Sequence, residues 1–435
     1  MGVFFYWHLL PFDKNPEPTY KILAKSTDSL FALIEIMSST SESKSQVLSP
    51  YDSQFSPEQR TIKTMVVNRK SSSNLAALLE LMPTDKGKEI TTRVVRSLQK
   101  GPYLWDPWIL NDGDVYRLFY LMAPKPVPPL NFWSKGTIYG AVSKDLQNWK
   151  FTGIVLEPEP SNTWEAGRIL AGSTYKEDGI YYLFYSASGA GDTLKNERIG
   201  IATSTDALNW KRYSSNPLFS EKVRSRWYGT QKDTGHFHWR DPYVVKDYRT
   251  SKYYMFISAY LKDESLNPYQ GCIGLAIADT ITGPYELLPP VASPSVSEIE
   301  DWPFLEMERP QIIYRNGKYY LFFSCWPSYL NPKWIEKLGA KQVRENQMLD
   351  VVLFWFVSDH IGGPYKPAVD IPIVKGSGKT GMYGTNFFPI PGNLEEFMAI
   401  GWYHRLSSIQ VSQRFKAYFK EESIEIRRNW GGICK

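Results

Sequence analysis

The feature that most constrains the fold is a Tyr-rich strand pattern that recurs along most of the chain. Four copies read YRLFY, YYLFY, YYMFI and YYLFF, and they begin at residues 116, 181, 253 and 319. The copies are therefore 65, 72 and 66 residues apart, and a fifth, degenerate copy (EFMAIGW) occupies residues 396–402. A nearly constant period of this length is typical of a repeat architecture.

Other segments recur in the same phase as the Tyr-rich strand. SKDLQNWK at 143–150 resembles STDALNWK at 204–211, and ADTITGPYE at 278–286 resembles SDHIGGPYK at 358–366. Each unit thus contains an apolar strand, a turn, the aromatic strand, a small-residue strand and an edge strand. Four strands in each unit predict a β-propeller. Five repeat starts predict five blades, and they lie at Asp106, Gly172, Asp241, Glu308 and Tyr383.

Residues 1–100 do not carry this repeat. The segment Ser38–Ser53 is rich in Ser and Thr, as expected of a loop, and 74–82 and 90–98 have short helical patterns. We therefore predict two regions. Residues 1–100 form an N-terminal extension of mixed loop and short helix, and residues 101–435 form an all-β, five-bladed propeller domain.

Composition excludes several classes of function. The net charge is only +5 and the basic residues are scattered, which argues against nucleic-acid binding. No stretch approaches 18 apolar residues, so no membrane span is predicted. Three distant cysteines without CxxC spacing indicate neither a disulfide framework nor zinc. His236 and His238 alternate on one strand without a third ligand, so we expect no metal and no other cofactor.

Three acidic residues stand at matching points of the repeat, in phase with one another, and each opens the first strand of its unit. They are Asp106 in LWDPWIL, Asp241 in WRDPYVV and Glu308 in EMERPQII. Because the first strand of each blade lines the propeller axis, their side chains should converge in one funnel. Two of them have an arginine beside them, Arg240 and Arg309, which can hold a carboxylate in place and keep it ionised. A proton donor and a second carboxylate are what glycoside cleavage requires.

The same segments carry a resemblance to a known family. ERPQIIYRNGKYYLFF resembles the acid/base segment of the levansucrase–inulosucrase family of fructosyl transferases. LWDP resembles that family's nucleophile segment, WRDP its transition-state stabiliser motif, and IGGPYKP a segment that follows the acid/base blade. These segments occur in the family's order over roughly residues 104–370, so the chain resembles a divergent member.

The resemblance implies roles for individual residues. Asp106 would be the nucleophile that forms a covalent fructosyl-enzyme, and Glu308 would be the acid and then the base. Asp241 would hydrogen-bond the hydroxyls of the fructosyl unit, with Arg240 orienting it, and Glu306 would contact the neighbouring sugar. Trp105 is either a stacking platform for a sugar or a core residue. The full set of predicted substrate-binding residues is Trp105, Ser173, Arg240, Glu306, Arg309 and Trp326.

The chain departs from the family's pattern at three points. A hydroxyl that supports the nucleophile in the family falls on Ala171, although Ser173 is retained. Trp326 replaces an Arg or His that the family uses near the leaving-group and acceptor sugar. An Asp of a calcium site in some members corresponds to Leu305, so calcium is not expected. These changes leave the carboxylates in place but alter both sugar pockets.

The leading hypothesis is therefore a retaining glycoside hydrolase or fructosyltransferase that acts on sucrose-like fructosides. An inverting propeller glycosidase acting on arabinan or xylan is one alternative, and a non-catalytic sugar-binding propeller is another. We expect a small-molecule or oligosaccharide substrate and a monomer. The N-terminal MGVFFYWHLLPF contains no clear signal peptide, and only the resemblance suggests an extracellular location. Residues 383–386 open blade five. They either contribute to the funnel or have a purely structural role, and the sequence leaves both possibilities open.

Overall fold

A computed structural model describes residues 101–428 of the chain, apart from short internal gaps. These gaps are 125–128, 161–162, 192–195, 230–237, 263–266, 347–349, 351, 370–371, 375–380, 391–392, 406–407 and 421–422. The predicted N-terminal extension, with its two short helices, lies outside the described residues, as do His236 and Cys434.

The strands form five antiparallel sheets, and each sheet is one blade. Blade one contains β1 (Tyr103–Asn111), β2 (Tyr116–Ala123), β3 (Thr137–Ser143) and β4 (Lys150–Leu156). Blade two contains β5 (Arg168–Glu177), β6 (Ile180–Ser188), β7 (Arg198–Ser204) and β8 (Lys211–Arg212). Blade three contains β9 (Trp239–Asp247), β10 (Lys252–Tyr260), β11 (Gly271–Ala278) and β12 (Glu286–Ala292).

Blades four and five complete the ring. Blade four contains β13 (Glu308–Arg315), β14 (Lys318–Cys325), β15 (Val352–Ser358) and β16 (Lys366–Pro367). Blade five contains β17 (Tyr383–Ile390), β18 (Asn393–Arg405), β20 (Phe415–Phe419) and β21 (Ile424–Arg428), with β19 (Ser408–Val411) paired to β18.

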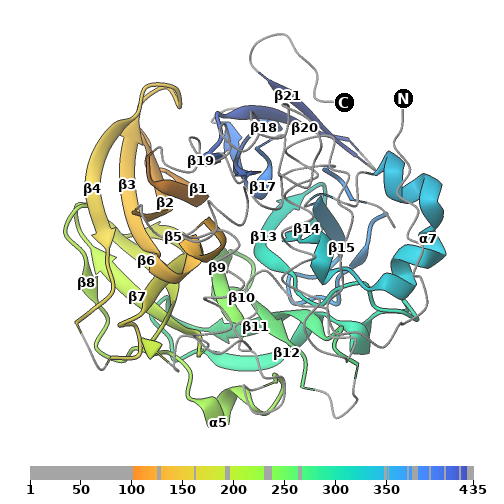
Figure 1. Cartoon of the computed structure of the whole chain (residues 1–435). Helices are drawn as coiled ribbons and strands as arrows, with labels where there is room; N and C mark the ends of the chain where they lie inside the picture. Colours follow the sequence, from red (N-terminus) through yellow and green to blue (C-terminus); the bar gives the residue numbers. More distant parts are fainter. Residues whose placement is uncertain are drawn as a thin grey trace, which may run out of the picture.

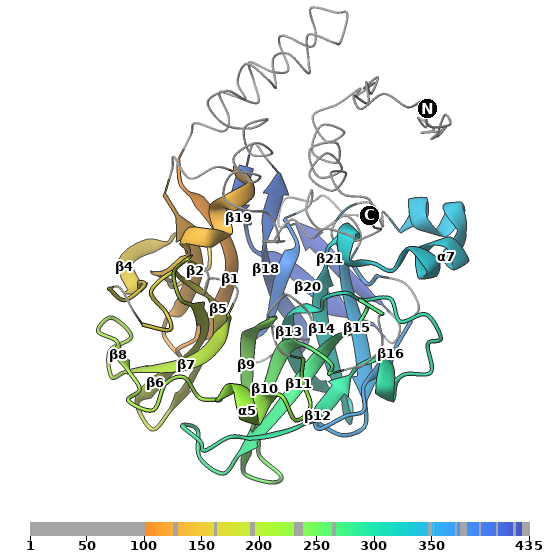
Figure 2. The ribbon, with the colours of Figure 1, turned by 60° about the horizontal axis from the view of Figure 1, so that its bottom comes forward.

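The blades are arranged around a common axis, as Figures 1 and 2 show. Their first strands are neighbours in a closed cycle, from β1 to β5, β9, β13, β17 and back to β1. Within each blade the chain runs outward from strand to adjacent strand. The predicted all-β, five-bladed propeller is therefore confirmed, with the first strand of each blade innermost.

The described part of the chain also contains short helices in the connections between strands. They are η1 (Pro129–Lys135), α5 (Glu221–Arg224), η3 (Pro294–Val296), η4 (Pro327–Tyr329) and α7 (Pro332–Glu345). The longest, α7, is inserted between β14 and β15 and lies at the outside of the propeller (Figure 2). Within the described ranges, no helix has the length and apolar character needed to cross a membrane.

The recurring YxLFY pattern is explained by burial on both faces of each blade. Its third and fourth residues point to opposite faces of the second strand, because side chains alternate along a strand. In blade two these residues are Leu183 and Phe184, and in blade four they are Leu321 and Phe322; all four are fully buried. Both faces are covered because each blade packs between two others, so this strand is apolar without alternation.

The innermost strands share one irregularity of the backbone. Pairing between the first and second strand is interrupted in every blade, between Trp105 and Trp108 in blade one and at the equivalent points of the others. In four blades one residue at this bulge has a left-handed φ: Asp106 (46°), Asp241 (56°), Arg309 (56°) and Gly384 (57°). A bulge of this kind re-aims a side chain relative to a regular strand.

Two residues beyond the bulge, equivalent side chains join each blade to the next. The Trp108 indole donates to Thr174 Oγ1 at 2.9 Å, and the Ser173 hydroxyl accepts from Val244 N at 3.1 Å. The Tyr243 hydroxyl donates to the Ile312 carbonyl at 3.4 Å. The last two contacts are Phe387 N to Gln311 Oε1 at 2.8 Å and Ile109 N to Asn386 Oδ1 at 3.1 Å. These five contacts form a closed ring of hydrogen bonds between neighbouring blades.

The first tyrosine of the repeat makes a second kind of link between blades. Tyr253 of blade three donates its hydroxyl to Glu177 of blade two, whose carboxylate also contacts Lys246 at 2.6 Å. Tyr181 of blade two donates to Asp112 of blade one in the same way, at 2.6 Å. An acid at the end of one inner strand is thus held by the tyrosine of the following blade.

We predict that Tyr253→Phe lowers the stability of the propeller by about 1–2 kcal/mol, because it removes a hydrogen bond to a carboxylate but leaves the buried ring. Thermal and denaturant unfolding would measure the change. Tyr116→Phe is the matched control, because Tyr116 begins the blade-one copy of the motif and its ring packs near Phe388, while no described residue hydrogen-bonds its hydroxyl. Equal losses in the two variants would contradict the inter-blade link.

Candidate active site

Asp106 lies at the axial end of blade one and has its two carboxylate oxygens in different environments. Oδ1 accepts a hydrogen bond from the Trp402 indole Nε1 at 2.9 Å and lies 4.0 Å from Arg309 Nε. No described residue donates to Oδ2. The bulge explains how the side chain reaches the axis, since Asp106 itself carries the left-handed φ.

Asp241 occupies the equivalent bulge position of blade three and is buried. Its Oδ2 accepts a hydrogen bond from the backbone N–H of Arg309 at 3.0 Å, and its own N–H donates to Ser186 Oγ at 3.2 Å. Arg240 Nε lies 4.0 Å from the same carboxylate oxygen. The carboxylate is therefore held by backbone geometry from blade four and by one cation.

Glu308 begins β13 and is also buried. Its Oε1 accepts a hydrogen bond from Arg240 Nη2 at 2.8 Å. Its Oε2 is buried without a hydrogen-bond partner in the described structure. A buried polar oxygen without a partner is unusual in a folded protein and marks a place where another molecule can bind.

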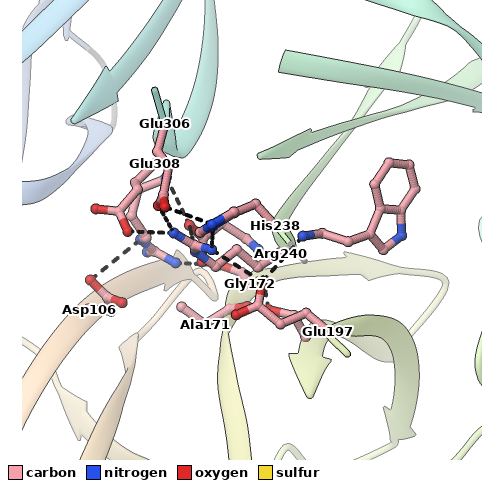
Figure 3. A network of polar contacts seen from close by, with 12 residues as sticks. Asp106, Ala171, Gly172, Glu197, His238, Arg240, Glu306 and Glu308 are labelled. Carbon is pink, nitrogen blue, oxygen red and sulfur yellow. Dashed lines mark hydrogen bonds and ion pairs between the residues drawn. The ribbon is translucent and has the colours of Figure 1, made fainter. Parts of the chain in front are cut away.

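Arg240 connects the carboxylates of three segments, and Figure 3 shows it at the centre of the network. Its guanidinium contacts Glu306 and Glu308 of blade four and lies 3.2 Å from Glu197 Oε2 of blade two. Burial lowers the pKa of Arg240, but the carboxylates around it outweigh this and hold the pKa well above its ordinary value. Arg240 is therefore a permanent cation in the site.

Glu306 has both carboxylate oxygens engaged by protein groups. Oε1 lies 2.7 Å from Nε2 of His238, and Oε2 contacts Arg240. His238 Nδ1 also faces Arg240, and the imidazole packs edge-on against Tyr260 with 4.7 Å between ring centroids. His238, which alternates with His236 in the sequence, thus belongs to the carboxylate network. No described group of three or more His, Cys, Asp or Glu side chains forms a metal-ligand cluster.

Glu197 is a part of this network that carries no motif in the sequence. It is buried just before β7, and it accepts hydrogen bonds from Arg168 Nη2 at 2.9 Å and from the backbone N–H of Trp239 at 3.2 Å. Glu197 also contacts Arg240 Nη1, so its carboxylate holds both the backbone of Trp239 and the guanidinium of Arg240. Sequence reasoning missed Glu197 because only the fold brings blade two against the start of β9.

The three acids are not at one equivalent position. Asp106 and Asp241 are the bulge residues of their strands, whereas Glu308 precedes the bulge and Arg309 occupies it. Glu308 is therefore equivalent to Arg240 in blade three, and the two side chains meet. The expectation that the acids repeat in phase is correct for the two aspartates and wrong by one residue for Glu308.

The side-chain hydrogen bonds of the two arginines go to groups other than the acid beside each in the sequence. Arg309 turns away from Glu308, lies near Asp106 and donates to the carbonyls of Gly172 and Pro107 at 3.3 and 3.2 Å. Arg240 is hydrogen-bonded to Glu308 rather than to Asp241. The reason is the bulge, which sends consecutive side chains to different sectors of the axis.

The pKa values of the acids are set mainly by burial. Burial raises the pKa of Asp106 to about 6, with Arg309 opposing the rise and Asp241 adding to it. Burial also raises the pKa of Asp241, and Arg309 and Arg240 oppose this. The pKa of Glu308 lies well above its ordinary value because burial and the charges of Glu306 and Asp241 outweigh Arg240. The site therefore favours an ionised Asp106 beside a protonated Glu308 near neutral pH.

Three of the predicted substrate-binding residues, Trp105, Ser173 and Trp326, pack against or hydrogen-bond to other parts of the propeller. Trp105 is 2% exposed and packs edge-on against Phe132 with 4.9 Å between centroids, so the core alternative describes it. Ser173 is the blade-joining residue described above. Trp326 is 2% exposed and packs against Tyr383 and His404. Their faces or polar atoms are occupied by the protein, which does not favour contact with a sugar.

The fold and this group of carboxylates define a class, the five-bladed propellers with an acidic axial site. The family model for glycosyl hydrolases family 43 matches residues 103–386, and the chain belongs to this family.

Curated relatives with detectable similarity are levansucrases. The levansucrase of Rahnella aquatilis is 26% identical over 267 residues, which cover 54% of this chain and 57% of the relative. The levansucrase of Erwinia amylovora is 25% identical over 263 residues, with 54% and 57% covered. The resemblance drawn from the motifs is confirmed, although the chain spans only a little over half the length of these relatives.

Solved structures of the same fold support the architecture. Inulosucrase from Halalkalicoccus jeotgali bound to kestose has a TM-score of 0.58 at 20% identity, covering 76% of this chain and 88% of its own. Bacillus subtilis levansucrase has a TM-score of 0.57 at 18% identity, covering 78% and 88%. At these identities the likeness concerns the fold.

We predict that Glu197→Ala destabilises the protein by about 3–5 kcal/mol, because it leaves Arg168 and Arg240 buried with one carboxylate fewer. Denaturant unfolding would measure the loss. Glu345→Ala is the control, since Glu345 forms an exposed pair with Lys341 at 3.9 Å and should change stability by less than about 0.5 kcal/mol. Similar losses in both variants would show that Glu197 does not hold the network.

Proposed function

We propose that this protein is a retaining glycoside hydrolase or fructosyltransferase that acts on sucrose-like fructosides. Membership in a glycosyl hydrolase family and similarity to levansucrases support the reaction class. One observation carries the proposal: Asp106 and Glu308 each present one protein-held oxygen and one oxygen without a described hydrogen bond.

The first step is attack by the Asp106 carboxylate on the anomeric carbon of the fructosyl unit. The glycosidic C–O bond breaks, and the proton of Glu308 passes to the leaving oxygen. The raised pKa of Glu308 supports this role, because the carboxyl must be protonated to act as an acid. A fructosyl ester on Asp106 and a free leaving sugar result.

The second step reverses the roles. Glu308, now ionised, takes a proton from water or from an acceptor hydroxyl, and this oxygen attacks the anomeric carbon. The ester C–O bond breaks and its electron pair returns to Asp106. Asp241 would bind hydroxyls of the fructosyl unit, and the hydrogen bond from the Arg309 N–H, which holds its carboxylate, supports this role. Arg240 supplies positive charge beside Glu308 and offsets the charge that Glu308 carries after proton transfer.

Asp106→Asn and Glu308→Gln should each lower turnover of the natural fructoside by more than about a thousandfold, because each removes a group that makes or breaks bonds. Incubation with sucrose, raffinose and arabinan, followed by product analysis, would measure this. Asp279→Asn is the control, since Asp279 is exposed and, among the described residues, forms an ion pair with Lys252 alone. Retained activity in Asp106→Asn would overturn the assignment of the nucleophile.

The kcat/KM profile should be bell-shaped. Activity should rise as pH increases through about 6, where Asp106 loses its proton, because only the carboxylate is a nucleophile. It should fall again at higher pH as Glu308 loses the proton that it must donate. Steady-state rates between pH 4 and 9 would test this. An acidic limb well below pH 5 would show that Asp106 is not the group that must ionise.

A second candidate is an inverting glycosidase acting on arabinan or xylan, which the match to glycosyl hydrolases family 43 favours. In that mechanism a carboxylate activates water and no ester forms. The two candidates differ in the anomeric form of the first product, which NMR detects during the reaction. Retention together with free glucose from sucrose favours the first candidate, and inversion with arabinan cleavage favours the second.

A further inference from the structure

Trp402 of blade five donates the only hydrogen bond that a described side chain makes to Asp106. Its indole Nε1 lies 2.9 Å from Oδ1 of this carboxylate, and the residue is fully buried. The equivalent bulge position in blade two, next to blade one, is Ala171, which has no polar side-chain atom. The group that holds Asp106 therefore comes from the opposite neighbour, blade five.

We propose that Trp402 is a positioning residue for the nucleophile: its indole N–H fixes Asp106 and favours the ionised carboxylate. This inference rests on the proposed function, in which Asp106 attacks the anomeric carbon. A hydrogen bond donated to a carboxylate stabilises its charged form and lowers its pKa. Trp402 thereby opposes the burial that raises the pKa of Asp106.

The contact also selects which oxygen reacts. Trp402 Nε1 and the closest atom of Arg309 both face Oδ1, at 2.9 and 4.0 Å. Oδ2 receives no hydrogen bond from a described residue. The geometry therefore assigns Oδ2 as the attacking atom. Trp402 and Arg309 stabilise the negative charge at Oδ1 until the ester forms.

The surroundings of Trp402 are built to keep the indole in this orientation. Tyr383 packs edge-on against it with 4.7 Å between ring centroids, and His404 lies 5.1 Å away. Gly384, the bulge residue of blade five, leaves the space for the hydrogen bond. A Cβ on Gly384 would lie 3.0 Å from both Asp106 Oδ1 and Trp402 Nε1, and its φ of 57° also disfavours a side chain.

The test is Trp402→Phe, which keeps an aromatic ring but removes the N–H donor. The pKa of Asp106 should rise by about one unit, so the acidic limb of kcat/KM should move about one pH unit higher. On that limb kcat/KM of Trp402→Phe should be about tenfold lower than that of the parent protein at the same pH. The difference in kcat/KM should become smaller near neutral pH. A uniform loss at every pH, with the limb unmoved, would show that Trp402 acts only in packing and would overturn the proposal.

Trp355→Phe is the matched control, because Trp355 is a buried indole of blade four that stacks on Tyr320 and whose Nε1 has no hydrogen-bond partner among the described residues. It should lower the melting temperature without moving the acidic limb. Gly384→Ala is a second variant that keeps the indole but disturbs the hydrogen bond. Its limb should move in the same direction, and an unmoved limb in both Gly384→Ala and Trp402→Phe contradicts the proposal.

A direct titration separates this inference from the proposed function. Aspartate labelled with ¹³C at the carboxyl carbon, with Asp106→Asn to assign the signal, reports the pKa of Asp106 without any substrate. A higher pKa in Trp402→Phe than in the parent protein supports the hydrogen bond, and an equal pKa overturns it. If the parent protein cleaves no glycoside, the proposed function fails while the titration still decides the role of Trp402.

Discussion

The closed ring of hydrogen bonds between neighbouring inner strands is the constraint on which the site depends. Trp108, Ser173, Tyr243, Gln311 and Asn386 stand at equivalent positions, and each joins its blade to the next. The bulge lies two residues before each of them. Because the ring fixes the strands relative to one another, it also fixes where the bulge side chains meet. Asn386, one of the residues of blade five whose role the sequence left open, is thus a structural member of this ring.

The bulge sends charged side chains at neighbouring positions to different partners. At the bulge itself, Asp106 and Asp241 reach the axis, and Arg309 takes the same place in blade four. One residue earlier, Arg240 and Glu308 meet as a buried pair, and Glu197 and Glu306 complete the surroundings of Arg240. Burying several charges is costly unless each has a partner, and this network gives most of them one. Asp106 and Glu308 each keep one carboxylate oxygen without a described partner. In the proposed chemistry these two oxygens react: that of Asp106 attacks the anomeric carbon, and that of Glu308 transfers the proton.

Much of the fold could be predicted because the repeat reports burial directly. Leu183 and Phe184 show why: a strand covered on both faces must be apolar at consecutive positions, and that pattern is visible in any copy. The three acids were also visible because each stands in a short motif with Pro or Arg. Glu197 and Trp402 were not: Glu197 stands in no motif, and Trp402 only ends the degenerate fifth copy of the strand pattern, so nothing local links either residue to the axial acids. For Trp105 and Trp326 the sequence could not choose between a sugar platform and the core, because an aromatic residue beside an axial acid fits both; in the structure both rings are buried.

The sequence by itself determined the number of blades, the strand order and which acids lie near the axis, because period and apolar pattern follow from local geometry and burial. Only the tertiary structure decided how those acids are paired. The bulge sends neighbouring residues to different sectors, so Arg240 meets Glu308 and Arg309 approaches Asp106, contrary to their order in the chain. The donor to Asp106 is likewise a tertiary fact, because Trp402 is separated from it by almost the whole propeller and reaches it only when blade five closes against blade one.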